Sequence, residues 1–163
     1  MGGNIVIIAA LFVSIFIVGC TEQGKPPATR EFSYDPPEGW VGKKDAESIK
    51  YAAPGGVFME VIILQEPIPA GMAPDQYLKA SEAQMSTIDK SYKLLSKKMR
   101  TINGYEAEEA IFTLMMEQNF IKTKQLTFIR DKTAYIISFA GLAVNYDVYD
   151  GKFEKSLGSL GLP

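Results

Sequence analysis

The sequence predicts an α+β domain, in which an antiparallel β-sheet of about six to seven strands is flanked by helices. Four segments between residues 92 and 140 have strand-like patterns and are separated only by short turns. Segments with helical spacing stand before and after these four. Residues 31–163, about 133 in number, have the common size of one domain with one core.

The first strand with a clear pattern is predicted at residues 57–65. Its apolar residues alternate, with Glu60 on the other face, and Pro67 ends it. A helix is predicted from Pro74, a residue suited to a first helical turn, to about residue 90. Its apolar residues fall on one face, so this helix should pack on the sheet.

Four strands then follow as sequential antiparallel neighbours, which form a meander. The first, residues 92–102, carries three basic residues near its end, as is typical of a strand near a sheet edge. Asn103-Gly104 predicts a type I′ hairpin, because both central positions of that turn need positive φ. The other strands are predicted at residues 105–117, 120–130 and 133–140.

A helix that begins near Asn145, a good N-cap residue, is predicted to close the domain. Large apolar residues recur along it at steps of three and four, and this stripe should pack on the sheet: Tyr146, Tyr149, Phe153, Leu157 and Leu160. Three acidic residues occupy the opposite side, where a solvated face is expected: Asp147, Asp150 and Glu154.

The N-terminal segment ends in Cys20, the only cysteine of the chain. The apolar run before it is about 14 residues long, shorter than the roughly 20 of a membrane span, and suits a signal peptide. The three residues that precede the cysteine complete a pattern that resembles the bacterial lipobox, whose cysteine is acylated: Ile17, Val18 and Gly19. We therefore predict a lipoprotein signal peptide at residues 1–19. It lacks the usual basic residue near Met1. An uncleaved anchor, a buried helix and an ordinary secretory signal are the alternatives.

Residues 20–30 predict a lipidated flexible tether, because they contain no large apolar residue and include two adjacent prolines. One acyl chain binds a membrane reversibly, whereas two or more hold a protein there stably. The predicted partner of Cys20 is thus a membrane, and the predicted location is the bacterial cell envelope. Thr21 favours the outer membrane, on its periplasmic face, if the cell has two membranes.

The composition excludes several function classes. The 17 basic and 19 acidic side chains nearly balance, which argues against nucleic acid as a partner. The chain has no histidine, which removes Ser-His-Asp and Cys-His sites and His-ligated zinc. A single cysteine allows neither an internal disulfide nor a thiolate metal cage. We therefore predict no catalytic residue, no metal site and no cofactor.

Several motifs occur in order along the domain. They are Phe32-Ser33-Tyr34-x-Pro36-Pro37-x-Gly39-Trp40, Ile102-Asn103-Gly104-Tyr105-Glu106-Ala107, Phe128-x-x-Asp131-x-x-x-Tyr135-x-Ile137, Asn145-Tyr146-Asp147-x-Tyr149 and Phe153-x-x-Ser156-Leu157. In order and spacing they resemble the PsbP-like domain family, which includes the DcrB-like bacterial lipoproteins. The resemblance implies an α/β/α sandwich over residues 31–163, an opening strand and turn at residues 32–40, and no established catalytic centre.

Two acidic groups are candidate cation ligands, because Ca²⁺ prefers carboxylate oxygens. One follows the hairpin turn and consists of Glu106, Glu108 and Glu109. Alternation along a strand turns Glu109 away from the other two, so a solvated face is expected there. The other group is the acidic side of the closing helix, for which the same interpretation is favoured.

Trp40 is expected to be a lid on one end of the sheet rather than an exposed recognition residue. The lysine pairs at residues 43–44 and 97–98 are too few to make a basic patch for anionic headgroups.

Three functions remain. The favoured one is a non-catalytic accessory or binding lipoprotein whose domain docks on an envelope protein. The alternative is a carrier of a small ligand or lipid, with a cavity between the sheet and the helix near residues 72–90. Met85, Met115 and Met116 are the only hint of such loose packing. The third, a carboxylate-based hydrolase, has no motif to support it.

Overall fold

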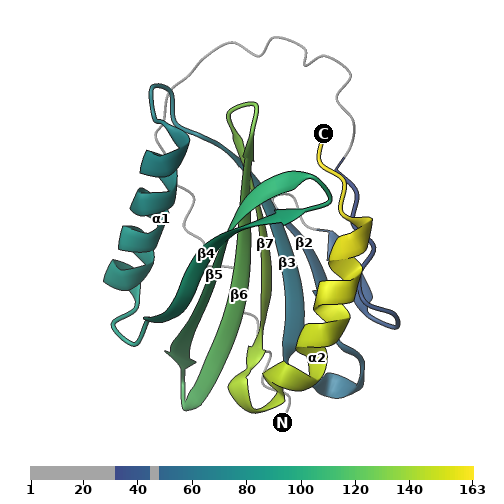
Figure 1. The fold of residues 1–163 in the computed structure, drawn as a ribbon. Coiled ribbons are helices and arrows are strands. Elements are labelled where there is room, and N and C mark those ends of the chain that lie inside the picture. Colours follow the sequence, from purple (N-terminus) through teal and green to yellow (C-terminus); the bar gives the residue numbers. More distant parts are fainter. Residues whose placement is uncertain (1–31, 45–47) are drawn as a thin grey trace.

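The computed structural model describes residues 32–44 and 48–163, which form one seven-stranded antiparallel sheet (Figure 1). Helix α1 covers one face of the sheet and helix α2 covers the other, so the predicted fold class and its sandwich arrangement are confirmed. The strands are β1 (Val41–Lys44), β2 (Ser48–Ala52), β3 (Met59–Pro67), β4 (Lys93–Ile102), β5 (Tyr105–Met116), β6 (Asn119–Arg130) and β7 (Thr133–Leu142). The helices are α1 (Pro74–Ile88) and α2 (Ala143–Ser156), with short 3-10 turns η1 (Pro54–Gly56) and η2 (Leu157–Ser159).

The strand order is β1-β2-β3-β7-β6-β5-β4. After β3, helix α1 carries the chain across one face to the far edge of the sheet, where β4 begins. Strands β4 to β7 return as a meander, and β7 pairs with β3. The predicted meander is therefore confirmed, with each strand boundary within two residues of its expected place.

The larger part of the core lies between the sheet and α2. Phe139 of β7 is at its centre, where its ring centroid lies 4.9 Å from that of Phe153 and 4.8 Å from that of Tyr146. The stripe predicted for the closing helix is the one that packs here. Two smaller clusters lie on the other face, where Tyr77 and Met85 of α1 meet the sheet. The central strands β3 and β7 are thus apolar on both faces, as strands covered on both sides must be.

The N-terminal part of the domain differs from the prediction. The expected opening strand at residues 32–40 is reduced to one bridge between Ser33 and Gly161. Strands β1 and β2, which are not among the predicted elements, extend the sheet instead. Strand β1 is exposed along its whole length and shows no alternation. Strand β2 has a short one, in which Ile49 and Tyr51 pack against the core. Pairing with neighbouring strands places both.

Helix α2 begins at Ala143, two residues before the predicted start. Leu142 occupies the N-cap position and makes no side-chain cap, so Asn145 lies inside the first turn and caps nothing. The cause is that β7 runs directly into the helix without a loop. Propensity at the N-cap is a weak determinant where tertiary packing fixes the entry of the chain.

The hairpin at Asn103-Gly104 has the predicted positive φ values, 51° and 83°. Asn103 has a second role, because its amide nitrogen donates to the carbonyl oxygens of Leu157, Gly158 and Leu160 at 2.9 to 3.1 Å. These carbonyls follow α2, so the β4–β5 turn fastens the C-terminal end of the domain.

Candidate functional site

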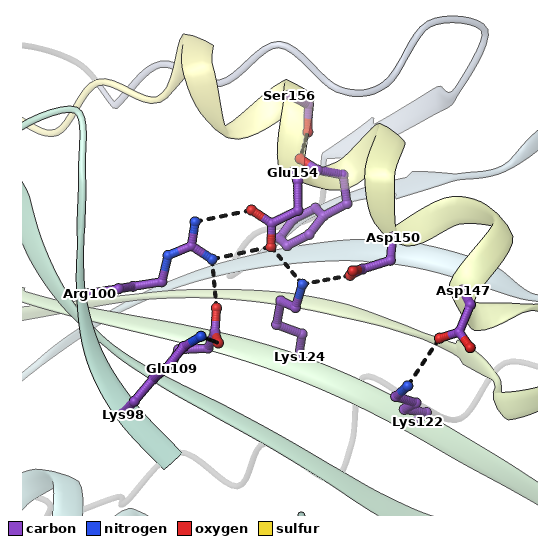
Figure 2. Close-up of polar contacts among 10 residues, drawn as sticks. Lys98, Arg100, Glu109, Lys122, Lys124, Asp147, Asp150, Glu154 and Ser156 are labelled. Carbon is purple, nitrogen blue, oxygen red and sulfur yellow. Dashed lines mark hydrogen bonds and ion pairs between the residues drawn. The ribbon is translucent and has the colours of Figure 1, made fainter. Parts of the chain in front are cut away.

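Charged side chains gather along one border of α2, between the helix and strands β4, β5 and β6 (Figure 2). The helix packs over β3, β7 and β6, so β5 and β4 lie at the margin of this face. We call the following eight residues the α2 ion-pair network: Lys98, Arg100, Lys122 and Lys124 with Glu109, Asp147, Asp150 and Glu154. Four positive charges therefore face four negative charges.

Arg100 joins the sheet to the last turns of α2. Its two terminal nitrogens donate to the Glu154 carboxylate at 3.1 and 3.0 Å, which is a bidentate arrangement. One of them also donates to Glu109 at 2.6 Å, and Lys98 lies 3.2 Å from the other Glu109 oxygen. The Glu109 side chain is only 3% exposed, so these two cations replace the water that stabilises an exposed carboxylate.

Lys124 makes the second connection to α2. Its ammonium donates to Asp150 and to Glu154, in both cases at 2.6 Å, and its side chain is 6% exposed. Lys122, two residues earlier on the same strand face, bonds Asp147 at 3.1 Å. The Asp147 side chain is 88% exposed, so water screens that pair, whereas Lys124 is largely shielded.

The pKa values reflect this pairing. Burial alone would raise the pKa of Glu154, but hydrogen bonds from Arg100 and Lys124 outweigh it and lower that pKa. The pKa of Glu109 is lowered in the same way, against its burial, by Arg100 and Lys98. Burial alone would lower the pKa of Lys124, but its bonds to the two carboxylates raise it. The network is therefore charged on both sides at neutral pH.

The predicted solvated faces are wrong for three of these residues, and also for Glu108, whose side chain is 17% exposed and lies 3.5 Å from Lys97. Glu109 does turn away from Glu106 and Glu108, as expected, but toward α2 rather than toward solvent. Asp150 and Glu154 face the basic residues of the sheet and are only about one-third exposed. The register explains this result: Lys98 pairs directly with Glu109 across the hairpin. That register follows from the predicted Asn-Gly turn and could have revealed the contact.

Neither acidic group is arranged as a cation site. Within residues 32–44 and 48–163, no cluster of carboxylates or thiolates has the geometry to hold a metal ion. Each buried carboxylate of the network is instead satisfied by lysine or arginine. The arrangement can hold α2 on the sheet.

A small cavity of about 30 Å³ lies on the opposite face, between α1 and strands β4 to β6. This is the place where a cavity is predicted by the ligand-carrier hypothesis. Met85 lines it, but Met115 lies exposed on the other face and Met116 is not among the lining residues. The remaining lining residues mix apolar and polar side chains: Leu78, Ser81, Glu82, Tyr92, Leu94, Lys97, Glu108, Ala110, Phe112, Gln125 and Thr127.

Four large apolar side chains are exposed at one end of the α2 face. We call them the apolar end patch: Met115, Phe120, Val144 and Val148. Met115 and Phe120 are paired on the neighbouring strands β5 and β6, and the two valines lie on the first turns of α2. The Lys122–Asp147 ion pair joins β6, which carries Phe120, to α2, which carries the two valines. Figure 1 shows the β5–β6 turn and the start of α2 at the same end of the molecule.

Trp40, Lys97 and Lys98, which are also named as candidates above, have structural roles. Trp40 is buried, with its ring 6.4 Å from Phe139 and 6.1 Å from Tyr149, in agreement with a lid over the core. Lys97 and Lys98 point to opposite faces, toward Glu82 of α1 and toward Glu109, so they form no basic patch.

The predicted lipidation residue Cys20 lies outside the described residues, as does its cleavage flank of Ile17, Val18 and Gly19. The predicted signal peptide and tether lie outside them too. Among the helices of residues 32–44 and 48–163, none combines the length and the hydropathy that a membrane crossing requires.

Comparison with known proteins identifies the fold. No family model and no curated protein sequence matches the chain. Solved structures do match it. The PsbP protein of the cyanobacterium Synechocystis sp. PCC 6803 has a TM-score of 0.62 at 11% identity, over 88% of this chain and 98% of that one. The fold is therefore PsbP-like.

Two further structures have the same fold. LpqN of Mycobacterium tuberculosis, described as involved in cell envelope biogenesis, has a TM-score of 0.66 at 8% identity, over 83% of this chain and 87% of that one. PA94 of Pseudomonas aeruginosa, whose function is unknown, has a TM-score of 0.61 at 11% identity, over 85% and 89% of the two chains. At such identities the likeness defines a fold and leaves the function to be argued from the surface.

Proposed function

We propose that this chain is a lipid-anchored protein of the bacterial cell envelope whose PsbP-like domain is a non-catalytic accessory module that docks on an envelope protein. The anchor in this proposal is Cys20, preceded by an apolar run of signal-peptide length. The envelope setting is also that of LpqN, a protein of the same fold.

The apolar end patch carries the docking part of the proposal. Phe120 is 60% exposed, although a phenylalanine is normally buried, and three more large apolar side chains are exposed at the same end of the domain. Neighbouring exposed apolar side chains with polar residues around them mark interaction surfaces.

A protein is the favoured occupant of this patch. Aromatic and methionine side chains are enriched in protein interfaces, and the patch offers one of each. The Lys122–Asp147 ion pair, between β6 and α2, contributes one charge of each sign and so adds no positive excess to attract anionic headgroups. A protein surface with both apolar and charged side chains would complement the exposed apolar side chains and the ion pair.

Site-specific photocrosslinking of the full chain in living cells tests the proposal. A photoreactive residue at position 120 should give a discrete adduct with another protein. The same residue at position 79, on the exposed side of α1, should not. A charged residue in the patch, Val148→Glu, should remove the adduct without lowering the thermal stability, because Val148 is exposed.

Other outcomes would contradict the proposal in recognisable ways. An adduct with twice the mass of the chain would identify a second copy as the occupant. Adducts with lipid alone would mean that the patch rests on the bilayer. Equal adducts from positions 79 and 120 would mean that the patch has no specific partner.

The small cavity favours a second, narrower candidate, the binding of a small ligand. An engineered protein cavity that binds benzene has a volume of about 150 Å³, whereas this one measures about 30 Å³. An acyl chain does not fit, so the lipid form of the carrier hypothesis is not supported. A head group of a few atoms does fit.

A further inference from the structure

Helix α1 buries much less of itself against the sheet than α2 does. Of the α1 side chains that the structure describes, Tyr77 alone is buried. The other face has three such side chains, Tyr146 and Phe153 of α2 and Leu157 directly after it. Because apolar burial is the main force that holds a helix on a sheet, α1 is the less firmly held of the two.

The polar contacts of α1 with the sheet are open to water. The Tyr77 hydroxyl donates to Glu66 of β3, which is half-buried. The Glu82 carboxylate lies 2.6 Å from the Lys97 ammonium, and these two side chains are 37% and 34% exposed. Water and salt screen such a pair, so it contributes little. Lys124, which pairs with α2, is by contrast 6% exposed.

The sheet face under α1 consists of two apolar clusters with polar residues between them. Tyr77, in the first turn of α1, packs on one cluster, and Met85, in its last turns, packs on the other. On β7, Ser138 lies between Ile136 of the first cluster and Ala140 of the second, and β6 repeats this arrangement. We call the residues between the clusters the polar strip: Thr123, Gln125, Thr127 and Ser138.

Two buried polar atoms of this strip have no hydrogen-bond partner among the described residues. They are the amide oxygen of Gln125 and the hydroxyl oxygen of Ser138, which belong to residues paired directly across β6 and β7. A polar atom buried without a partner disfavours the closed arrangement, because water would bond it if the helix moved away. The small cavity beside Gln125 shows that α1 is also incompletely packed here.

We propose that α1 is a lid, which leaves the sheet as a unit while the sheet and α2 stay folded, and whose opening uncovers the polar strip. Gly71, exposed and at a φ of 80°, suits a hinge before the helix, because glycine changes its φ freely. The exposed residues 90–91 follow the helix. The inference goes beyond the docking proposal, since it depends on neither Cys20 nor the apolar end patch.

Amide hydrogen exchange of the full chain in detergent micelles measures such an opening. A detached helix of 15 residues is only marginally stable in water, so its backbone amides exchange when α1 leaves the sheet. Each of the two additional side chains buried on the α2 face should raise protection at least about tenfold. We therefore expect residues 79–86 of α1 to be protected at least about 100-fold less than residues 148–155 of α2.

Two variants separate opening of α1 from unfolding of the whole domain. Phe153→Leu weakens α2 equally in the closed and the open form, so it should lower the protection of α2 about tenfold and leave that of α1 unchanged. Tyr77→Phe removes the bond to Glu66, which both opening and unfolding break, and should lower the protection of both helices about tenfold. Lys79→Gln, on the exposed side of α1, is the control and should change either value by less than about threefold.

Urea provides a check that needs no variant. Opening of α1 exposes less surface than unfolding of the whole domain, so the protection of α1 should fall less steeply with urea than that of α2. Equal protection of the two helices, equal urea slopes, or an equal loss in both helices of Phe153→Leu would overturn the proposal. Each of these results would mean that α1 leaves the sheet only when the whole domain unfolds.

Discussion

Replacing Lys124 by methionine should destabilise the domain, because Lys124 connects β6 to two carboxylates of α2. Methionine keeps the apolar stem but removes the ammonium, so Asp150 and Glu154 lose one partner each. The Lys124 side chain is 6% exposed, which places its interactions in a region that water does not readily enter.

The expected cost follows from these contacts. A hydrogen bond to a charged group contributes about 1.5–3 kcal/mol, and Lys124 makes two. Asp150 and Glu154 are about one-third exposed and can regain water, and Glu154 keeps Arg100, so the lower part of the range applies. We expect a loss of about 3 kcal/mol in the free energy of unfolding.

The assay is urea unfolding of the full chain in detergent micelles, followed by the fluorescence of Trp40, the only tryptophan, which is buried against the same core. With a urea dependence of about 2 kcal/mol per molar, the midpoint should fall by about 1.5 M. Lys122→Met is the matched control, since it lies on the same strand face but pairs with the exposed Asp147. It should cost about 1 kcal/mol or less.

Similar losses in the two variants would refute this reasoning. If Lys124→Met and Lys122→Met agreed within about 0.5 kcal/mol, burial would not determine the strength of these pairs.

Three further predictions concern the same core. Because the pKa of Glu154 is lowered on folding, its contribution to stability is complete above about pH 4.5 and is lost as the pH falls below that value. Urea midpoints measured against pH should therefore decline less steeply in this acidic range in Glu154→Gln than in the wild type. Gly141→Ala should cost about 2–3 kcal/mol, because a β-carbon there would lie 2.5 Å from the backbone oxygen of Phe58 and would also overlap the Met59 side chain. Gly151→Ala, in open space on α2, should instead add up to about 1 kcal/mol, and equal effects in thermal unfolding would contradict this. Asn103→Ala should be less stable than Asn103→Gly by about 1–2 kcal/mol in urea unfolding, since only glycine adopts the positive φ without strain, and an equally stable pair would exclude that cause.

The parts of the fold that the sequence predicts are those with strong local signals. The meander follows from alternation and from the Asn103-Gly104 turn, and both appear in the structure where they are expected. Strand β1 has no such signal, because an exposed edge strand needs no apolar face. In β2 the alternation of Ile49 and Tyr51 lies within only five residues. The place of both strands is determined by pairing within the sheet, a tertiary contact that a pattern within one segment does not contain.

The charged sites show the same limit. A helix pattern predicts which side of α2 carries Asp150 and Glu154, but not that Arg100, more than fifty residues earlier, lies opposite them. Alternation correctly turns Glu109 away from its neighbours, yet the position of α2 decides whether that face is solvated. The cavity and the apolar end patch likewise depend on how helices sit on the sheet, and only the structure provides that.

The account depends most on the membrane anchor at Cys20. Intact mass spectrometry of the protein extracted from membranes, compared with Cys20→Ser, measures it directly. We predict a mature chain that begins at Cys20 and carries the added mass of a diacylglyceryl group, absent from the variant. An unmodified full-length mass in both samples would mean that the apolar segment is retained, and the proposal of a lipid-anchored docking module would be contradicted.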